Sequence, residues 1–361
     1  MTRRATAVLF GLSLALQACA HFRRLPPGEA LTPQQRLEAI RSAEVWAPTD
    51  IPSLDLGAGP GGKGAFAPNE WVACEFKDKK LSGRSAKFEC ELAPGDKVKV
   101  KYGQLNGEVY GEVLATRLFW ALGFPADRMY PVRVRCHGCP GDPWVSADKA
   151  GDVAEFDPAA IERKLPGRPM ETRPESGWKW PELERIGSGA GAEARARRDA
   201  LKLLAAFVQH TDSKPAQQRI LCPKGEELGK TGCRRPVLMV SDLGLTFGEA
   251  SLFNANSKGS VSFERWSRTP VWRNRGLCVA QLKRSWTGTL KHPRISEAGR
   301  AFLAGLLVQL SDAQLRDLFE TARVERRPRD PRQDGPPASV DEWVAAFKRK
   351  RSEIVEHRCP R

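Results

Sequence analysis

The stretch that decides the fold is His210-Thr211-Asp212-Ser213-Lys214-Pro215-Ala216-Gln217. It directly follows residues 194–209, in which apolar side chains recur at helical spacing and predict an amphipathic helix. By itself, an H-x-D sequence in a loop is usually a turn in which the Asp side chain accepts local hydrogen bonds. Whether this segment has a catalytic function therefore depends on the other residues of the chain that accompany it.

Three further charged residues lie around this loop in the chain. Val240-Ser241-Asp242-Leu243-Gly244 comes thirty residues after Asp212, and alone it would be a turn signal. Upstream, the alternating sequence K-V-K-V-K-Y predicts a strand over 97–102 that places Lys101 on one face, with Lys99 as an alternative. A predicted helix over 111–122 carries Glu112, for which Glu108 is the alternative.

In chain order, these segments resemble the protein kinases. The loop at 210–217 is similar to the catalytic loop H-R-D-x-K-P-x-N, and D-L-G at 242–244 is similar to D-F-G. The short spacing between Lys101 and Glu112 resembles atypical branches: HipA-type, CotH-type, secretory-pathway and phosphatidylinositol kinases. The resemblance covers residues 70–325. It departs from the family in having Gln217 for Asn, no glycine-rich loop and no A-P-E motif.

The resemblance implies an α+β fold with two lobes. The N-lobe would be a small antiparallel β structure with one helix, and the C-lobe would be larger and mainly helical. It also implies ATP, or another nucleotide, with Mg²⁺ or Mn²⁺ as cofactor. By this resemblance, Asp212 orients or deprotonates the attacking hydroxyl, and Lys214 contacts the γ-phosphate. Asp242 and Gln217 hold the metal. Lys101, held by Glu112, binds the α and β phosphates.

The N-terminus indicates export. Met1-Thr2-Arg3-Arg4 is basic, and residues 5–16 are an apolar run too short to span a membrane. The following Leu16-Gln17-Ala18-Cys19 resembles a bacterial lipobox, which implies lipidation of Cys19; a plain signal peptide is the alternative. Because Ala20 rather than Asp follows, we expect a protein anchored by its lipid in the outer membrane and facing the periplasm.

Export predicts disulfides among the other eight cysteines, because an even number of cysteines in an oxidising compartment suggests that they are paired. Eight cysteines allow 105 connectivities. Pairing neighbours in the sequence predicts these bridges: Cys74–Cys90, Cys136–Cys139, Cys222–Cys233 and, as the remaining pair, Cys278–Cys359. Cys136-His137-Gly138-Cys139 could instead bind zinc, although a single CxxC is weak evidence for a metal.

The chain divides into five predicted regions: a signal peptide at 1–18, a flexible tether at 19–66, the N-lobe at 67–158, the C-lobe at 159–325, and a Pro-rich break with a last helix at 326–361. The glycine-rich run at 57–64 lacks the strand and helix of a phosphate-binding loop and is interpreted as linker. Further strands are expected at 71–76, 86–92, 129–135, 219–222 and 236–240, and further helices at 297–309, 311–324 and 339–356.

Composition limits the function classes. With 41% hydrophobic and 28% charged residues, the chain is neither wholly disordered, collagen-like nor a polytopic membrane protein. The net charge of +15 suits an anionic ligand or an acidic envelope surface, or it simply reflects a basic proteome. We expect a monomer with no nucleic-acid partner that phosphorylates a hydroxyl of a protein, lipid or glycan. The alternatives are a pseudokinase-like binding module and a basic structural lipoprotein that binds acidic envelope polymers.

Overall fold

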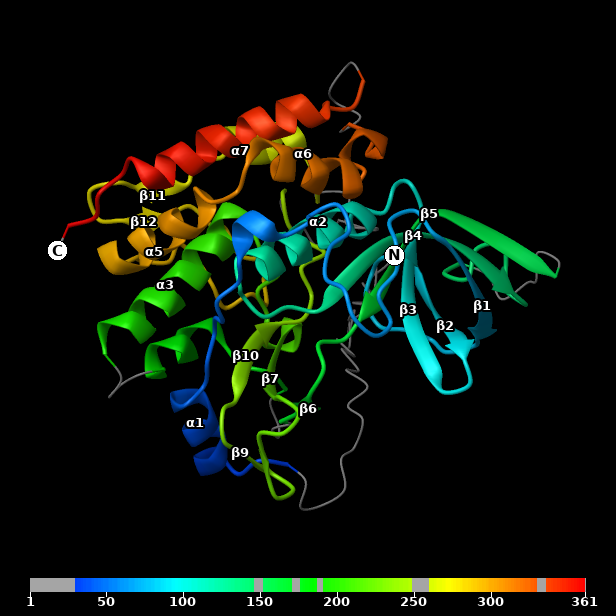
Figure 1. The fold of residues 1–361 in the computed structure, drawn as a ribbon, viewed down its shortest axis with the longest axis horizontal. Helices are drawn as coiled ribbons and strands as arrows, with labels where there is room; N and C mark the ends of the chain where they lie inside the picture. The colour runs from blue at the N-terminus through cyan, green and yellow to red at the C-terminus, as the bar shows by residue number, and fades with distance from the viewer. Residues whose placement is uncertain are drawn as a thin grey trace, which may run out of the picture.

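The computed structural model describes residues 30–145, 152–170, 176–186, 191–248, 260–329 and 336–360. Cys19 and the proposed signal peptide lie outside these residues. The protein is mixed α+β, as predicted, with a five-stranded barrel at one end and most of the helices at the other (Figure 1). Among the described residues, no helix is both long and apolar enough to cross a membrane.

The barrel contains the strands β1 (Trp71–Lys77), β2 (Lys87–Ala93), β3 (Asp96–Tyr102), β4 (Arg128–His137) and β5 (Val153–Arg163), in the spatial order β1-β2-β3-β5-β4. Alternation in β3 buries Val98 and Val100, as the sequence predicts. Two predictions were wrong. The barrel is not purely antiparallel, because β1 pairs with β4 in parallel, and β5 runs past residue 158, so the barrel extends to residue 163.

Helix α2 (Glu108–Ala121) connects β3 to β4 and lies between the barrel and the helical part (Figure 1). All but one of its residues are buried, because it packs against β4 on one side and α6 on the other. A helix buried on every side needs no polar face. The sequence placed its start at residue 111, and the structure adds the turn that contains Glu108.

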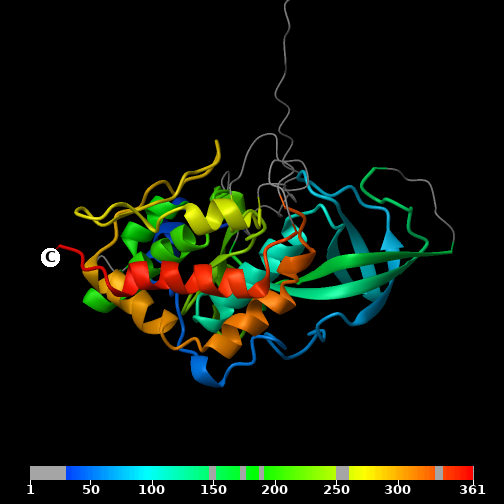
Figure 2. The same ribbon diagram turned by 90° about the horizontal axis from the view of Figure 1, so that it is seen from above.

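The helical part is built around α3 (Ala192–Phe207), which packs against α5 (Glu297–Leu307). Helix α7 (Val340–Val355) lies across α5 and α6 (Asp312–Thr321), as Figure 2 shows. Capping boxes begin α6 at Ser311 and α7 at Ser339, as predicted. Because α7 buries Trp343 and Phe347 in the main core, residues 340–355 belong to this body and not to a separate tail.

Shorter elements complete the helical part. They are α1 (Pro33–Arg41), α4 (Phe263–Arg268), the sheet β10 (Val237–Val240), β7 (Gln218–Cys222) and β6 (Arg168–Pro169), the hairpin β8 (Glu227–Leu228) and β9 (Gly232–Cys233), and the pair β11 (Trp272–Asn274) and β12 (Val279–Ala280). Single turns of 3₁₀-helix lie at Ile51–Ser53, Pro215–Gln217 and Val324–Arg326, with a longer one at Trp180–Arg185.

The prediction of a flexible tether at 19–66 was wrong for the residues that the structure describes. Ile40, Ile51 and Leu56 are fully buried in the main core. The start of the glycine-rich run contacts Arg117 of α2. The buried guanidinium of Arg117 donates hydrogen bonds to the carbonyls of Leu56 and Gly57 at 2.6 and 2.7 Å. Main-chain carbonyls of this segment therefore satisfy a buried cation, which composition alone does not reveal.

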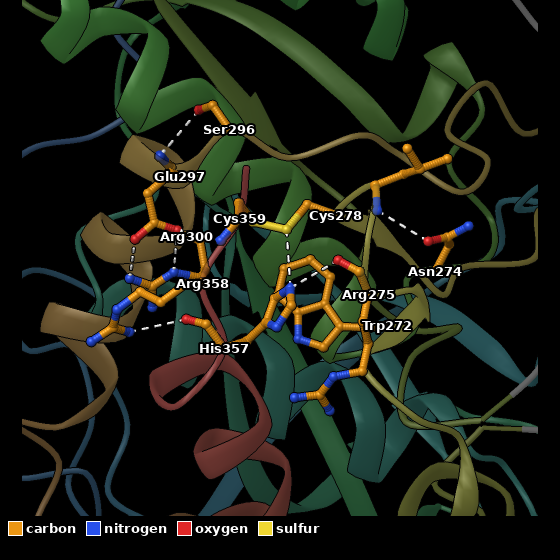
Figure 3. The surroundings of a disulfide bond; sticks show 12 residues. Trp272, Asn274, Arg275, Cys278, Ser296, Glu297, Arg300, His357, Arg358 and Cys359 are labelled. Atoms are coloured by element: carbon orange, nitrogen blue, oxygen red, sulfur yellow. Dashed lines mark hydrogen bonds and ion pairs between the residues drawn. A yellow bond between two sulfur atoms is a disulfide. The ribbon is translucent and has the colours of Figure 1, made fainter. Parts of the chain in front are cut away.

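All four predicted disulfides are present. Because Cys136 and Cys139 are bonded to each other, neither offers a thiolate to zinc. The Cys278–Cys359 bridge ties the C-terminal segment to the β11–β12 region, with His357 beside it (Figure 3). The main-chain N–H of Cys359 also donates to Glu297 of α5, so the end of the chain is held at two points.

Candidate active site

The best-defined polar cluster lies where β3 meets α2. Lys101, only 1% exposed, extends its ammonium to the carboxylate of Glu112 at 2.5 Å and to that of Glu108 at 2.6 Å. Asp242 Oδ1 lies 3.9 Å from the same nitrogen. The two glutamates that the sequence offered as alternatives therefore both contact one lysine, because they are one helical turn apart on α2.

Lys99 is engaged elsewhere. It lies opposite Glu162 of β5, and their charged groups are 2.5 Å apart. The alternation in β3 predicts that Lys99 and Lys101 lie on the same face of the strand, but it does not indicate which of them contacts the glutamates of α2. The structure favours Lys101 over Lys99, because the ammonium of Lys101 contacts both Glu108 and Glu112 of α2.

The charges of this cluster perturb one another. Burial acts to lower the pKa of Lys101, but the carboxylates of Asp242, Glu108 and Glu112 outweigh it and raise that pKa well above its usual value. Burial and the neighbouring carboxylates raise the pKa of Glu112 to about 8, against the effect of Lys101. For Asp242, Lys101 and Lys99 overcome burial and hold the pKa far below its usual range.

The cluster fits a divalent cation. Carboxylate oxygens of Glu108, Glu112 and Asp242 lie within 4.8 Å of one another, and carboxylate oxygens are the ligands that Mg²⁺ and Mn²⁺ prefer. The sequence indicated Glu108 only as an alternative partner for Lys101, and it did not predict that Glu108 lies beside Asp242.

The D-L-G segment is packed too closely for another residue at its glycine. Gly244 N–H donates to Asp242 Oδ1 at 3.1 Å, and a Cβ at Gly244 would lie 2.6 Å from Glu108 Cγ. Thr246 then joins this segment to α2 through a hydrogen bond to the carbonyl of Gly111. Glycine here permits the close approach that brings Asp242 to Glu108.

Asp212 is the centre of a second cluster. Its Oδ2 accepts from Lys214 at 2.6 Å and from the Gln217 side-chain amide at 2.9 Å. Its Oδ1 accepts from the hydroxyl of Ser285 at 3.1 Å. Ser285 was missed by sequence reasoning, since it lies 73 residues away in a loop with no motif of its own.

The two clusters are joined through Gln217. While its side chain donates to Asp212, its main-chain carbonyl accepts from the N–H groups of Ser241 at 2.8 Å and Asp242 at 3.4 Å. A short 3₁₀ turn over Pro215–Gln217 directs the chain between the two aspartates. Lys101, Asp212, Lys214, Gln217 and Asp242 are therefore joined by one continuous series of contacts.

His210 is a structural residue. Its ring is fully buried, 6.0 Å from the ring of Trp180, and neither ring nitrogen has a hydrogen-bond partner among the described residues. Burial lowers its pKa from 6.5 to about 4, despite the nearby carboxylates of Asp212 and Asp242. A neutral, buried imidazole next to Asp212 serves to hold the loop and is not placed to exchange protons with solvent.

Comparisons with known proteins give only weak similarities. No protein-family model matches the sequence, and no curated protein is a significant relative. The solved structures that match include three kinases. The proinflammatory kinase CtkA of Helicobacter pylori matches at 9% identity and a TM-score of 0.43. The match covers 80% of this chain and 96% of the CtkA chain.

The second is the Golgi casein kinase, solved with Mn and ADP, at 10% identity and a TM-score of 0.36 over 80% of this chain and 72% of that one. The third is the Rio2 kinase of Chaetomium thermophilum, at 11% identity and a TM-score of 0.29 over 69% and 72%. At these values the similarities assign neither activity nor substrate to this chain.

Proposed function

We propose that the protein is a metal-dependent, kinase-like phosphotransferase that moves the terminal phosphoryl group of ATP, or another nucleoside triphosphate, to a hydroxyl group. One observation carries the proposal: Lys101 contacts Glu112 and Asp242, and Gln217 links Asp242 to the carboxylate of Asp212. Phosphoryl transfer depends on positioning and on charge neutralisation, and this site provides residues for both.

Each residue takes a role from its contacts. Lys101, an ammonium held by two glutamates, binds the α and β phosphates. Asp242, with Glu108 and the amide oxygen of Gln217, holds Mg²⁺ or Mn²⁺, which when bound offsets the negative charge of the phosphates. Burial of Lys101 between strand and helix fixes its position before the nucleotide arrives.

Asp212 acts on the acceptor hydroxyl. Its Oδ1, which now accepts from Ser285, orients the incoming hydroxyl and receives its proton. Lys214, at 2.6 Å from Oδ2, is 36% exposed in its side chain and can contact the transferred phosphoryl group. Gln217 holds the same Oδ2 and so restrains the rotation of the carboxylate.

The proposed location is the bacterial envelope. We propose that Cys19 carries the lipid, that the protein is a monomer facing the periplasm from the outer membrane, and that it has no nucleic-acid partner. Four disulfides support an oxidising compartment. The acceptor is a hydroxyl of a protein, lipid or glycan.

The experiment is a thermal-shift titration of mature protein with ATP and Mg²⁺ or Mn²⁺. At 100 times the Kd, binding stabilises by about 2.7 kcal/mol, a rise in Tm of roughly 4 °C for a chain of this length. Asp242→Asn should abolish the shift, whereas Asp212→Asn should keep it but lose phosphoryl transfer. Asp341→Asn, at an exposed site on α7, is the control. No shift in the wild type with any nucleotide would reject the proposal.

One observation favours a second candidate, a pseudokinase-like binding module. Three donors already satisfy the Asp212 carboxylate, so an acceptor hydroxyl must compete with Ser285 for Oδ1. Under this alternative, ATP and metal raise the Tm, and Asp242→Asn abolishes the rise. No ³²P then appears on the protein or on casein, dephosphorylated lipopolysaccharide or phosphatidylinositol offered as acceptors.

A further inference from the structure

Lys87 of β2 lies directly opposite Lys101 of β3 in their antiparallel pair, and the two strands run side by side in Figure 1. Residues opposite each other in such a pair point to the same face, about 5 Å apart at Cβ, where two like charges destabilise the sheet. Lys101 contacts the carboxylates of Glu108 and Glu112. In the part of the chain that the structure describes, the ammonium of Lys87 has no hydrogen bond and no ion pair.

The ammonium of Lys87 lies close to the segment that joins β1 to β2. A Cβ at Gly83, in that segment, would lie 2.4 Å from Lys87 Nζ, so only glycine leaves room for the ammonium there. On another side, Nζ lies 5.6 Å from the centre of the Trp144 ring, within the range of a cation–π contact. The main-chain N–H of Trp144 donates to the hydroxyl of Tyr102, the residue after Lys101, at 3.0 Å. The lysine is therefore directed by its surroundings toward the Lys101 cluster.

The electrostatics connect Lys87 with the same cluster. Burial and the ammonium of Lys101 lower the pKa of Lys87, and the carboxylates of Glu108 and Asp242 act against this effect. Lys87 is only half-buried, so a ligand can reach it. An anion that contacts both ammonium groups would offset their repulsion. Proteins break a local pairing rule of this kind chiefly at functional sites, which is why the lysine pair indicates a ligand.

We propose that Lys87 is a second phosphate-binding residue, which contacts a polyphosphate chain beside Lys101, that of the nucleoside triphosphate in the proposed function. The inference rests on that function, because it places the nucleotide at Lys101 and Asp242. In protein kinases a glycine-rich loop covers the phosphates, whereas residues 77–85, which hold its place here, contain one glycine. A lysine ammonium binds phosphate as a point charge, so β2 supplies a contact that the missing loop does not make.

The test is a calorimetric titration of mature protein with ATP and Mn²⁺ at physiological ionic strength, which screens the exposed charges. Lys87→Gln should raise the Kd about tenfold, because the phosphates lose a charged donor. Lys97→Gln, at an exposed position of β3, is the control and should change the Kd by less than about twofold. The midpoint of urea denaturation should be the same in both variants, since Lys87 gives up no ion pair among the described residues.

A second pair of variants displaces the ammonium without removing it. Gly83→Ala places a Cβ against Lys87 Nζ, whereas a Cβ at Gly95, in the turn between β2 and β3, meets no atom within 4 Å. Both glycines have positive φ, so alanine strains the backbone at either position. We expect Gly83→Ala to weaken ATP binding by about threefold or more and Gly95→Ala to leave it unchanged. Equal weakening in the two variants would contradict the proposal.

The outcomes distinguish this inference from the proposed function. Equal ATP affinity in the wild type and in Lys87→Gln overturns the inference, while the proposed function still stands on Lys101 and Asp242. A urea midpoint lowered in Lys87→Gln but not in Lys97→Gln would indicate a structural role and would also overturn it.

Inorganic tripolyphosphate with Mn²⁺ is the probe that lacks the nucleoside, and its Kd should rise about tenfold in Lys87→Gln as well. If the wild type binds tripolyphosphate with this dependence on Lys87 but binds no nucleotide, the proposed function fails and the phosphate-binding role of Lys87 is retained. A wild-type protein that binds neither ligand rejects both.

Discussion

The ammonium of Lys101 lies 2.5 Å from Glu112 and 3.9 Å from Asp242, so one buried cation joins strand β3, helix α2 and the D-L-G segment. Each of these elements comes from a different part of the chain, and their charged groups meet where the side chain of Lys101 is almost without solvent. The arrangement stabilises the junction between the barrel and the helical part only while the charges compensate one another.

Replacing Lys101 by Met should therefore lower the free energy of unfolding by about 3–5 kcal/mol, because it removes the cation that Glu108, Glu112 and Asp242 surround. Urea denaturation at pH 7 measures the change. Lys97→Met, at an exposed position of the same strand, should change stability by less than about 0.5 kcal/mol. Equal losses in the two variants would contradict the role of the buried network.

The pH dependence of stability should carry the signature of His210. Its pKa is lowered from 6.5 to about 4 by burial, so between these values the unfolded chain binds a proton that the folded protein does not. Stability is then complete above pH 6.5 and falls as the pH drops toward 4, by about 3 kcal/mol in total.

His210→Phe replaces the imidazole by a somewhat larger aromatic ring that does not titrate, so the slope of stability against pH between 6.5 and 4 should become shallower. The measurement is a series of urea denaturation curves from pH 7.5 to 4.5. The exposed His137, when replaced by Phe, should leave the slope as in the wild type. An unchanged slope in His210→Phe would show that other groups control the acid sensitivity.

Loss of the Cys278–Cys359 disulfide should be the costlier of two bridge deletions. It joins residues 81 apart, whereas Cys222–Cys233 joins residues 11 apart. Loop-closure entropy predicts losses of about 4.5 and about 3 kcal/mol for the double Cys→Ala variants. Comparing their denaturation midpoints tests the order, and a thiol assay on native mature protein should detect none of these eight cysteines.

Ser285→Ala should lower the free energy of unfolding by about 1 kcal/mol, because the Asp212 carboxylate loses one of its three donors. The affinity for ATP with Mn²⁺ should stay unchanged, since the proposed nucleotide site lies at Lys101 and Asp242. Ser285→Thr retains the hydroxyl and should behave as the wild type, and Thr287→Ala tests the loop itself. Weaker nucleotide binding in Ser285→Ala would conflict with this separation of roles.

Two glycines of the 57–64 run provide a matched pair. Gly59 and Gly62 both have positive φ, but a Cβ at Gly59 would lie 2.4 Å from the Arg117 guanidinium, while Gly62 has open space. Gly62→Ala should cost about 1 kcal/mol for backbone strain, and Gly59→Ala about 1–3 kcal/mol more for the displaced arginine. Equal losses by thermal denaturation would restore the interpretation of this run as a free linker.

The sequence by itself determined the local features of this protein. Alternation predicted β3, helical spacing predicted α3, and the Ser311 and Ser339 capping boxes marked the starts of α6 and α7. These signals are local because they depend on the backbone period and on side chains within one turn. The disulfides followed from proximity in the chain for three pairs and from elimination for the fourth.

Only the tertiary structure decided which residues meet. The parallel pairing of β1 with β4, the choice of Lys101 over Lys99, the place of Glu108 beside Asp242, and the hydrogen bond from Ser285 to Asp212 all join distant segments. The packing of residues 31–66 was missed for the same reason. Their glycines and prolines indicate a linker locally, whereas their burial depends on the buried guanidinium of Arg117 and on a core surface that other elements provide.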